Sequence, residues 1–298
     1  MRKKILVLIR EKGQSKYEVG RIVEEAEKLG FEITVALYKD LRFELCGDKN
    51  LVWVKDTLVN KTNFDLIYFR VAGTGDGRYV EARNLLIRLV GNEIRCINKS
   101  GYLTWPRMGK IAQHGVFVKN KIPVVESMVF YKKDEVKINW DFPIIVKHEM
   151  GYQGKSVIKL DTEVDFKKFL KKLSDKDLGR MLWQRCLPNK WDLRVIVING
   201  KVIGAIKRSA VGEEFRSNFS LGGRVEKWDL SKNDRKIAQK VAKSCGLDYC
   251  GVDIMKGLPR SGGVKDGNSF VLEVNRQCQF RGFEKATGIN VAKEIIIR

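Results

Sequence analysis

Histidine is scarce in this sequence, and its cysteines do not cluster. Only His114 and His148 occur among 298 residues, and the six cysteines are scattered without a close-paired metal spacing. The nearest pair, Cys245 and Cys250, has no histidine beside it, which argues against a zinc site. Because disulfides are rare in cytosolic proteins, we expect buried, reduced thiols.

Long apolar runs are also missing. No run approaches the roughly 20 residues that a membrane-spanning helix needs. Met1-Arg2-Lys3-Lys4 leads into only five apolar residues, too few for the core of a signal peptide. These features predict a cytoplasmic globular protein. The 44% of hydrophobic residues suffices for a buried core, and the length favours two domains or one large multi-lobed domain.

Positive charge is abundant. The chain has 57 basic and 36 acidic residues, a formal net charge of +21. Such an excess attracts polyanions, including RNA, ribosomes, acidic peptides and polyphosphorylated ligands. The excess is spread along the chain, so a generally basic, solvated surface explains it equally well. The charge alone does not identify a partner.

The first hundred residues alternate between strand and helix patterns. Apolar runs predict strands at 5–9, 31–37 and 66–71, and helical spacing predicts helices at 17–29 and 78–90. This alternation is typical of a parallel α/β unit. The glycines at 73–77 lack the dinucleotide-binding spacing and indicate a plain strand-to-helix turn. A boundary is expected at 99–101, before a helix around 106–114.

The middle of the chain predicts a hairpin with a glycine-rich loop. Strands at 143–147 and 155–160 flank the loop at 149–154. Lys147 ends an apolar strand, where burial without an anionic partner is costly. It therefore indicates a phosphate clamp, although a lysine that extends its ammonium to solvent stays an alternative. A helix at 161–173, capped by Asp161 or Thr162, precedes a strand at 181–187 whose apolar side chains can wall an adenine.

Polar residues follow the remaining predicted strands. Asn199-Gly200 is a strong hairpin signal between strands at 193–198 and 202–206, after which Lys207 and Arg208 emerge. A helix at 231–245 is capped by Ser231. Asp253 and Glu273 offer carboxylates, and Asn275 shares a face with Glu273 because side chains alternate along a strand. Such oxygen ligands suit Mg²⁺ that also binds substrate phosphates. Nearby arginines suit phosphate or carboxylate.

Several motifs occur in a fixed order from Arg107 to the C-terminus. They are Lys147 with Gly151 and Gly154, Asp192-Leu193-Arg194, Phe215-Arg216-Ser217-Asn218 with Gly222-Gly223, Gly251-Val252-Asp253, Glu273-Val274-Asn275 and Glu284-Lys285-Ala286-Thr287-Gly288. Together they resemble an ATP-grasp ligase of the RimK-like, glutamate-ligase type. The resemblance implies an ATP-grasp fold of α/β class with α+β lobes. Its parts would be an N-terminal parallel α/β pre-ATP-grasp domain at 1–100, a central lobe with the glycine loop at 101–182, and a C-terminal lobe with the metal and substrate site at 183–298.

The resemblance also implies site residues, with ATP between the last two lobes. ATP would contact Lys110, Lys147, Gly151, Gly154, Gln184, Arg185, Leu187, Asp192, Arg216, Ser217 and Asn218. Asp192 would bind the ribose, and Mg²⁺, or Mn²⁺, would bind Asp253, Glu273 and Asn275. Arg208 would face the substrate carboxylate and Arg216 the transferred phosphoryl group, which makes them the predicted catalytic residues.

The chain departs from the family pattern at three places. Arg185 replaces the usual glutamate after the hinge glutamine, so adenine recognition rests on backbone groups or base selectivity is relaxed. Residues 276–280 replace a small Ser-Pro-Gly-like run, and 257–268 form an enlarged polar loop. The last two changes lie where an acceptor would enter, so glutamate is not carried over as the substrate.

The leading prediction is an ATP-dependent carboxylate–amine ligase that forms an acyl phosphate and then an amide. Its acceptor would be an amino acid, peptide, protein or small molecule. Phosphoryl transfer needs charge neutralisation more than a protein nucleophile, and no Ser-His or Cys-His arrangement is evident. The alternative is a basic nucleic-acid-binding protein without catalysis, although it lacks an aromatic-interleaved basic motif. A ligase acting on RNA-bound or ribosomal protein termini would reconcile both features. An oligomer stays open.

Overall fold

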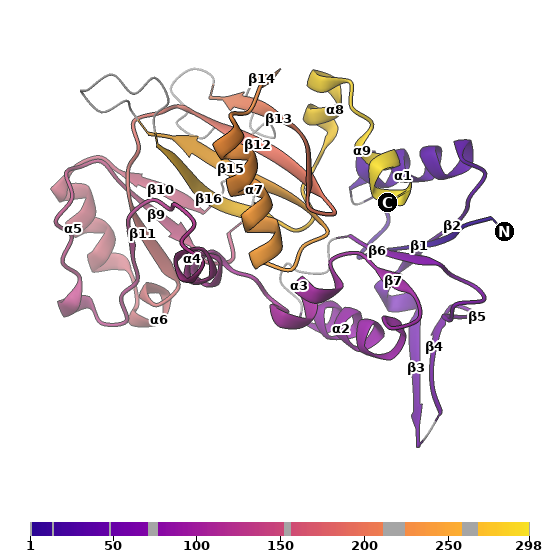
Figure 1. Ribbon diagram of the computed structural model, residues 1–298. Coiled ribbons are helices and arrows are strands. Elements are labelled where there is room, and N and C mark those ends of the chain that lie inside the picture. The colour runs from indigo at the N-terminus through magenta and orange to yellow at the C-terminus, as the bar shows by residue number, and fades with distance from the viewer. Residues whose placement is uncertain are drawn as a thin grey trace.

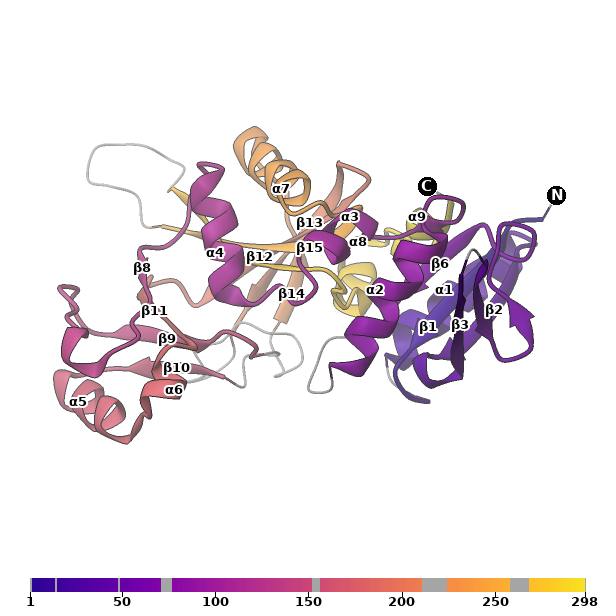
Figure 2. The same ribbon diagram turned by 90° about the horizontal axis from the view of Figure 1, so that it is seen from below.

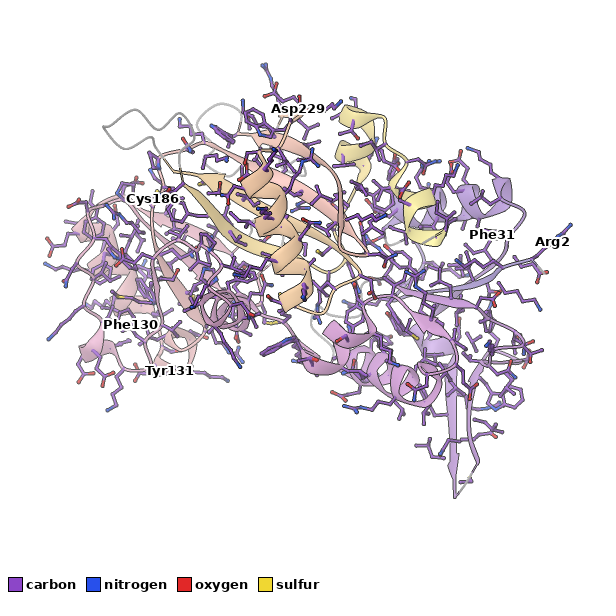
Figure 3. The ribbon with its side chains drawn as sticks, viewed as in Figure 1. Arg2, Phe31, Phe130, Tyr131, Cys186 and Asp229 are labelled. Carbon is purple, nitrogen blue, oxygen red and sulfur yellow. The ribbon has the colours of Figure 1, made fainter. Side chains whose placement is uncertain are left out.

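The computed structural model describes residues 2–13, 15–47, 49–70, 77–151, 156–210, 224–257 and 268–297. The elements form three groups along the molecule, with the C-terminal sheet between the N-terminal and central groups (Figure 1). Figure 3 shows Arg2 and Phe31 at the outer end of the N-terminal group and Phe130 and Tyr131 in the central group at the opposite end. None of the described helices has both the length and the apolar character that a bilayer crossing requires.

The N-terminal group is built on a parallel sheet in the order β2-β1-β6-β7. Its elements are β1 (Lys4–Ile9), α1 (Lys16–Lys28), β2 (Glu32–Leu37), β6 (Leu66–Phe69), α2 (Arg78–Val90), β7 (Arg95–Cys96) and α3 (Lys99–Thr104). β1 and β6 are almost wholly buried because strands of a parallel sheet are covered on both faces. The predicted strand–helix alternation is confirmed.

A small antiparallel sheet in the N-terminal group is absent from the sequence prediction. It follows the 3-10 turn η1 (Tyr38–Asp40) and consists of β3 (Leu41–Cys46), β4 (Lys49–Val54) and β5 (Thr57–Leu58). Val52 and Val54 are buried, whereas most of β3 is exposed or half-buried. The hairpin of β3 and β4 extends away from the other two groups in Figure 1.

The central group is an antiparallel sheet in the order β10-β9-β11-β8. Its elements are α4 (Lys110–Lys119), β8 (Ser127–Met128), the 3-10 turn η2 (Lys133–Glu135), β9 (Ile144–His148), β10 (Val157–Leu160), α5 (Glu163–Lys172), α6 (Asp175–Leu178) and β11 (Met181–Arg185). Trp183 anchors its core, with edge-on contacts to Phe130, Phe166 and Phe169. Thr162, not Asp161, caps α5 by accepting from the Asp165 N–H.

The C-terminal group is an antiparallel sheet in the order β14-β13-β12-β15-β16. Its elements are β12 (Trp191–Ile198), β13 (Lys201–Ser209), β14 (Arg224–Lys227), α7 (Lys232–Ser244), β15 (Tyr249–Lys256), β16 (Ser269–Asn275), α8 (Arg281–Thr287) and α9 (Val291–Ile297). Asn199 and Gly200 both have positive φ, as the predicted tight hairpin requires. Figure 2 shows α4 between the central and C-terminal sheets. Arg208 lies within β13 instead of emerging after it, because this strand continues to Ser209.

The N-terminal and C-terminal groups share one hydrophobic core. Buried side chains of β1, including Ile5 and Val7, belong to the same cluster as Phe283, Val291 and Ile295 of α8 and α9. α9 lies against α1 (Figure 1). The two predicted domain divisions, after residues 100 and 182, fall inside α3 and β11. The three-domain division stays a prediction, since this packing crosses its first boundary.

Candidate nucleotide and ligation site

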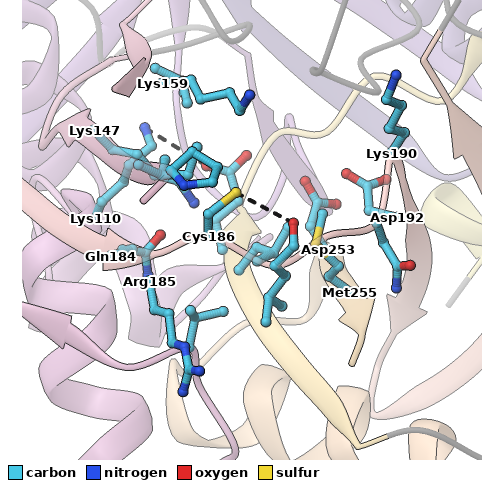
Figure 4. Close-up of a pocket in the computed structure, with 18 of the residues that line it drawn as sticks. Lys110, Lys147, Lys159, Gln184, Arg185, Cys186, Lys190, Asp192, Asp253 and Met255 are labelled. Atoms are coloured by element: carbon cyan, nitrogen blue, oxygen red, sulfur yellow. Dashed lines mark hydrogen bonds and ion pairs between the residues drawn. The ribbon is translucent and has the colours of Figure 1, made fainter. Parts of the chain in front are cut away.

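A cavity of about 390 Å³ lies between the central and C-terminal sheets. Ten of the predicted site residues line it: Lys110, Lys147, Gly151, Gln184, Arg185, Leu187, Asp192, Arg208, Asp253 and Glu273. Figure 4 shows Lys110, Lys147 and Lys159 on one side, and Asp192 and Asp253 on the other. The fold therefore gathers cations of the central group opposite carboxylates of the C-terminal sheet.

The two predicted metal-binding carboxylates face each other across neighbouring strands. Asp253 of β15 pairs with Glu273 of β16, and Asn275 follows two residues later. The amide nitrogen of Asn275 donates to Glu273 at 3.1 Å and to Asp253 at 3.4 Å. All three side chains thus converge, as the period-two alternation predicts.

Two arginines hold Asp253. Arg194 of β12 donates from Nε and Nη2 to the two carboxylate oxygens, with 2.8 Å from Nη2 to Oδ2, and Arg208 Nη2 lies 3.0 Å from Oδ2. Burial alone would raise the pKa of Asp253, but the two guanidinium groups outweigh it and hold the pKa below its usual range. Arg208 also donates to Asp192 at 2.6 and 2.8 Å. Asp253 is therefore ionised, and Arg208 joins two buried acids.

The donors present fit a Mg²⁺ ion. Among the described residues no group of three or more His, Cys, Asp or Glu can hold a metal. Two carboxylates and one amide oxygen still match the oxygen set that Mg²⁺ takes together with substrate phosphates. Asn275 would turn its amide oxygen inward in place of the nitrogen. The metal role of Asp253, Glu273 and Asn275 stays a prediction on this chemistry.

Two lysines approach the carboxylates from the central group. Lys110, at the start of α4, donates to the carbonyl of Gly151 and lies 3.7 Å from Glu273. Lys147 lies on β9, the strand between β10 and β11, and its backbone neighbours on these strands are Val157 and Leu182. Burial lowers the pKa of Lys147 to about 8, although Glu273 opposes the shift. A phosphate in this cavity would supply the negative charge that stabilises the Lys147 cation.

The hinge strand β11 supplies a polar group that is fixed by its neighbours. Gln184 is buried and its amide nitrogen donates to Ser127 Oγ at 2.8 Å and to His114 Nε2 at 2.9 Å. His114 Nδ1 lies 3.2 Å from the Lys110 carbonyl, so its proton is placed on Nδ1. Burial lowers the pKa of His114 to about 4, and Lys147 adds to the effect. These contacts leave the amide oxygen of Gln184 for the cavity.

The remaining lining is partly apolar. Val125, Ile145, Leu187, Met255 and Leu272 line the cavity and provide a surface that an adenine ring can pack against. Arg185 is exposed, and its side chain extends away from Lys147 and Asp253 in Figure 4.

Four residues of the site are not among the predicted ones: Arg194, Lys159, and the two partners of Gln184, which are His114 and Ser127. Arg194 could have been found, because it follows Asp192 by two residues and therefore shares its face of the strand. Lys159 lies two residues after Val157 on β10, so both side chains share one face of the strand and line the cavity. Four predicted residues, Gly154, Arg216, Ser217 and Asn218, lie outside the described residues, as do Gly222 and Gly223.

A second, larger cavity of about 920 Å³ adjoins the first. It extends from α4 and β16 to the N-terminal group, and its lining includes Asn275 and shares Lys110, Gly151, Arg208 and Glu273 with the first cavity. Ten of its lining residues are Lys or Arg and four are Glu. A ligand here would therefore meet an environment rich in cations, beside the predicted metal ligands.

Comparison with known proteins places the site in a family. The model of the RimK-like ATP-grasp domain matches residues 108–298. A probable alpha-L-glutamate ligase 2 of Pseudoalteromonas atlantica is 35% identical over 156 residues, 52% of this chain and 49% of the relative. The chain thus spans about half the length of the first relatives it matches. A probable alpha-L-glutamate ligase of Trichodesmium erythraeum is 27% identical over 95% of this chain and 91% of its own.

Solved structures share the whole fold. The ATP-grasp ligase PsnB, complexed with a minimal precursor, has a TM-score of 0.73 and 21% identity over 98% of this chain and 97% of its own. An ATP-grasp ligase associated with RiPP peptides from Chryseobacterium gregarium, in complex with ADP and a leader and core peptide, has a TM-score of 0.72 and 16% identity over 98% of this chain and 95% of its own. These likenesses establish an ATP-grasp fold. Since the family model covers well over half of the sequence, the chain belongs to the RimK-like ATP-grasp family.

Proposed function

We propose that this protein is an ATP-dependent carboxylate–amine ligase. The observation that carries the proposal is the first cavity, where two lysines, two facing carboxylates and a fixed hinge glutamine converge and open onto the larger basic cavity. The lysines, carboxylates and glutamine of the first cavity suit a nucleotide, and a second, anionic reactant can enter through the larger cavity. The nucleotide is ATP, as in the family, and Mg²⁺ would neutralise its phosphates when bound.

The reaction takes place in two steps. A carboxylate oxygen of the acid substrate attacks the γ-phosphorus of ATP, a P–O bond to ADP breaks, and an acyl phosphate forms. The amine then attacks the acyl carbon, the bond to phosphate breaks, the amine loses a proton, and an amide remains. Lys147 and Lys110 would hold the phosphates, Gln184 would accept from the adenine amine, and Asp192 would reach the ribose. These groups stabilise charge without becoming covalently attached.

Arg208 has a more constrained position than the sequence suggests. Its Nε and Nη2 already bind Asp192 and Asp253. Its proposed contact with a substrate carboxylate would use Nη1, for which the described residues offer no hydrogen bond. The role of Arg216 beside the transferred phosphoryl group, and those of Gly154, Ser217 and Asn218, stay proposals from the family pattern.

The acceptor is proposed to be an amino acid or a peptide. The solved structures of similar fold bind precursor, leader or core peptides, and the curated relatives are named glutamate ligases. The cavity of about 920 Å³ has room for more than a single amino acid. The matched family gives no support to the nucleic-acid-binding alternative, which we do not propose. Manganese, an RNA-associated partner, an oligomer and a cytoplasmic location stay predictions from the sequence.

The test is release of ADP from ATP and Mg²⁺, screened against amino acids and short peptides in pairs. We expect ADP to appear only when one member supplies a carboxylate and the other an amine, with a new amide detected by mass spectrometry. ADP release without any amide product, for every pair, would contradict ligation.

A further inference from the structure

Two arginines in the wall of the larger cavity, Arg83 and Arg276, have no acidic partner among the residues that the structure describes. Arg83 of α2 is 1% exposed, and Arg276, directly after β16, is half-buried. Neither forms an ion pair with a carboxylate of the described residues, although most other buried cations of this cavity do. Burying a charge without a counter-ion is costly, so this pair requires an explanation.

The two guanidinium groups converge on one place. Arg83 Nη2 donates to the Pro106 carbonyl at 3.0 Å, and Arg276 Nη2 lies 3.4 Å from the same oxygen. Both groups also lie over the ring of Tyr102. The distance from the guanidinium carbon Cζ to the ring centroid is 3.9 Å for Arg83 and 4.9 Å for Arg276. The ring and the carbonyl offset part of the cost, but they do not neutralise two positive charges.

Donors remain open on both side chains. The hydrogen bonds of Arg83 use Nε and Nη2, and those of Arg276 use Nη1 and Nη2. Within the described part of the chain, Arg83 Nη1 and Arg276 Nε have no hydrogen-bond acceptor. Guanidinium groups stay charged at neutral pH, so an anion beside these open donors would be stabilised.

The position of the pair separates it from the reacting groups. Arg83, Tyr102 and Arg276 line only the larger cavity, whereas Lys110, Arg208 and Glu273 line both. The carboxylate that is phosphorylated must lie beside the nucleotide phosphates, and therefore next to the shared residues. Arg276 is also one residue beyond Asn275, so a ligand held by the pair lies close to the reacting centre without occupying it.

We propose that Arg83, Tyr102 and Arg276 form a binding site for a substrate carboxylate that the reaction leaves intact. The proposal rests on the ligase function proposed above and extends it to the substrate: one of the two reactants carries a second carboxylate. Planar guanidinium groups match a carboxylate, and the phenol ring holds them in place. This second carboxylate belongs either to the acid substrate or to the amine substrate.

The experiment measures binding, so it does not depend on turnover. L-glutamate, its α-amide isoglutamine and its side-chain amide glutamine are titrated calorimetrically into the full-length protein with Mg²⁺ and ADP. We expect L-glutamate to bind at least about tenfold more tightly than one of the two amides, the loss of a charge-assisted contact. N-acetylglutamate, which lacks a free amine, identifies the source of the second carboxylate. If N-acetylglutamate binds as tightly as L-glutamate, the carboxylate belongs to the acid substrate. If it binds as weakly as the amide, the carboxylate belongs to the amine substrate.

Variants of the pair complete the test. Arg276→Gln, and Arg83→Gln if it folds, should remove the preference for the carboxylate, whereas ATP affinity stays within about twofold of wild type. Arg281→Gln is the matched control, because Arg281 lines the same cavity with its guanidinium over Tyr17. It should keep the preference.

Two results would overturn the site. One is wild-type protein that binds L-glutamate no better than either amide. The other is Arg276→Gln protein that is less stable to heat but retains the full preference. Arg276 would then have only a structural role, through the hydrogen bond that its Nη1 donates to the Trp105 carbonyl. The ligase proposal is judged separately by amide formation, so each idea can fail without the other.

Discussion

At the scale of single residues, the site is held together by charge pairs that join different strands. Arg208 binds Asp192 and Asp253, and Arg194 binds Asp253 from the same neighbouring strand as Asp192. Removing one member of such a buried set leaves the others without compensation, which costs more than the pair contributes when intact.

We therefore expect Arg208→Ala to destabilise the protein as well as to impair catalysis. Loss of this cation removes the two hydrogen bonds that Asp192 accepts from Arg208 and one of the two guanidinium groups that hold Asp253, so the free energy of unfolding should fall by about 3–5 kcal/mol. Urea denaturation followed by tryptophan fluorescence measures it. Lys207→Ala, the neighbouring residue paired with the exposed Glu226, should cost less than about 1 kcal/mol. Equal, small losses in both variants would contradict the network.

Lys147 gives a prediction that depends on pH. Its pKa in the free protein is lowered to about 8, so the cation is lost as pH rises through 8. Wild-type affinity for ATP should decline between pH 7 and pH 9, and Lys147→Ala should bind ATP about 10- to 100-fold more weakly at pH 7, the loss of one charged contact. Lys171→Ala, on the surface of α5, is the control. Calorimetry giving equal affinities for Lys147→Ala and wild type would show that Lys147 is only a buried lysine with a solvated end.

The residue scale was partly predictable from the sequence. The spacing of Glu273 and Asn275 predicted that they share one face, and the family resemblance added Asp253 to the same set. The pairing of Asp253 with Glu273 across neighbouring strands is visible only in the structure. Arg194 follows the same rule from Asp192 and belongs to the motif Asp192-Leu193-Arg194, but no specific role was predicted for it. The contacts of Gln184 with His114 and Ser127 had no sequence signal, because the three residues come from separate elements that only the tertiary fold brings together.

At the scale of elements, helix α4 and strand β11 are linked by a buried neutral histidine. His114 of α4 accepts from Gln184 of β11, and burial lowers its pKa from 6.5 to about 4. The unfolded chain therefore binds more protons than the folded chain between pH 4 and 6.5. By linkage, stability rises with pH across this window and is lost as pH falls.

We expect His114→Gln to flatten this dependence. In wild type, the histidine accounts for a loss of about 3 kcal/mol between pH 7 and pH 4. The variant should lose less than wild type over the same range, as measured by urea denaturation at several pH values. An unchanged dependence would mean that His114 does not stay neutral in the folded protein. His148→Gln is the control, because His148 is half-buried and its ring nitrogen Nδ1 accepts from the Met150 N–H.

Most elements were predictable because their apolar periodicity is clear. The strand–helix alternation of the first lobe, the glycine-loop hairpin and the Asn-Gly turn all appear near their predicted positions. The sheet of β3, β4 and β5 was not predicted, because much of β3 is solvent-exposed and gives no buried pattern. The extension of β13 through Arg208 was not predicted, because a cation after an apolar run usually marks the start of a loop. Here Arg208 stays buried within the strand because Asp192 and Asp253 pair with its guanidinium.

At the scale of the whole molecule, the C-terminal helices contribute to the N-terminal core. α9 packs on α1, and buried residues of both belong to one cluster. No local pattern predicts this, since it depends on contacts between residues more than 250 positions apart, such as Lys3 with the Ile296 carbonyl. The arrangement supports the wall of the larger cavity, whose lining is rich in basic side chains.

The central claim is that Asp253 and Glu273 serve Mg²⁺-dependent transfer of a phosphoryl group from ATP. The most direct measurement is acid- and amine-dependent ADP release by Glu273→Gln and Asp253→Asn proteins that retain the wild-type circular dichroism spectrum. Glu226→Gln, an exposed carboxylate on β14, is the control. We expect both site variants to lose at least about 100-fold in rate, since metal stabilisation of the transferring phosphoryl group is worth several kcal/mol. Near-normal, Mg²⁺-dependent ADP release by both site variants would contradict the account.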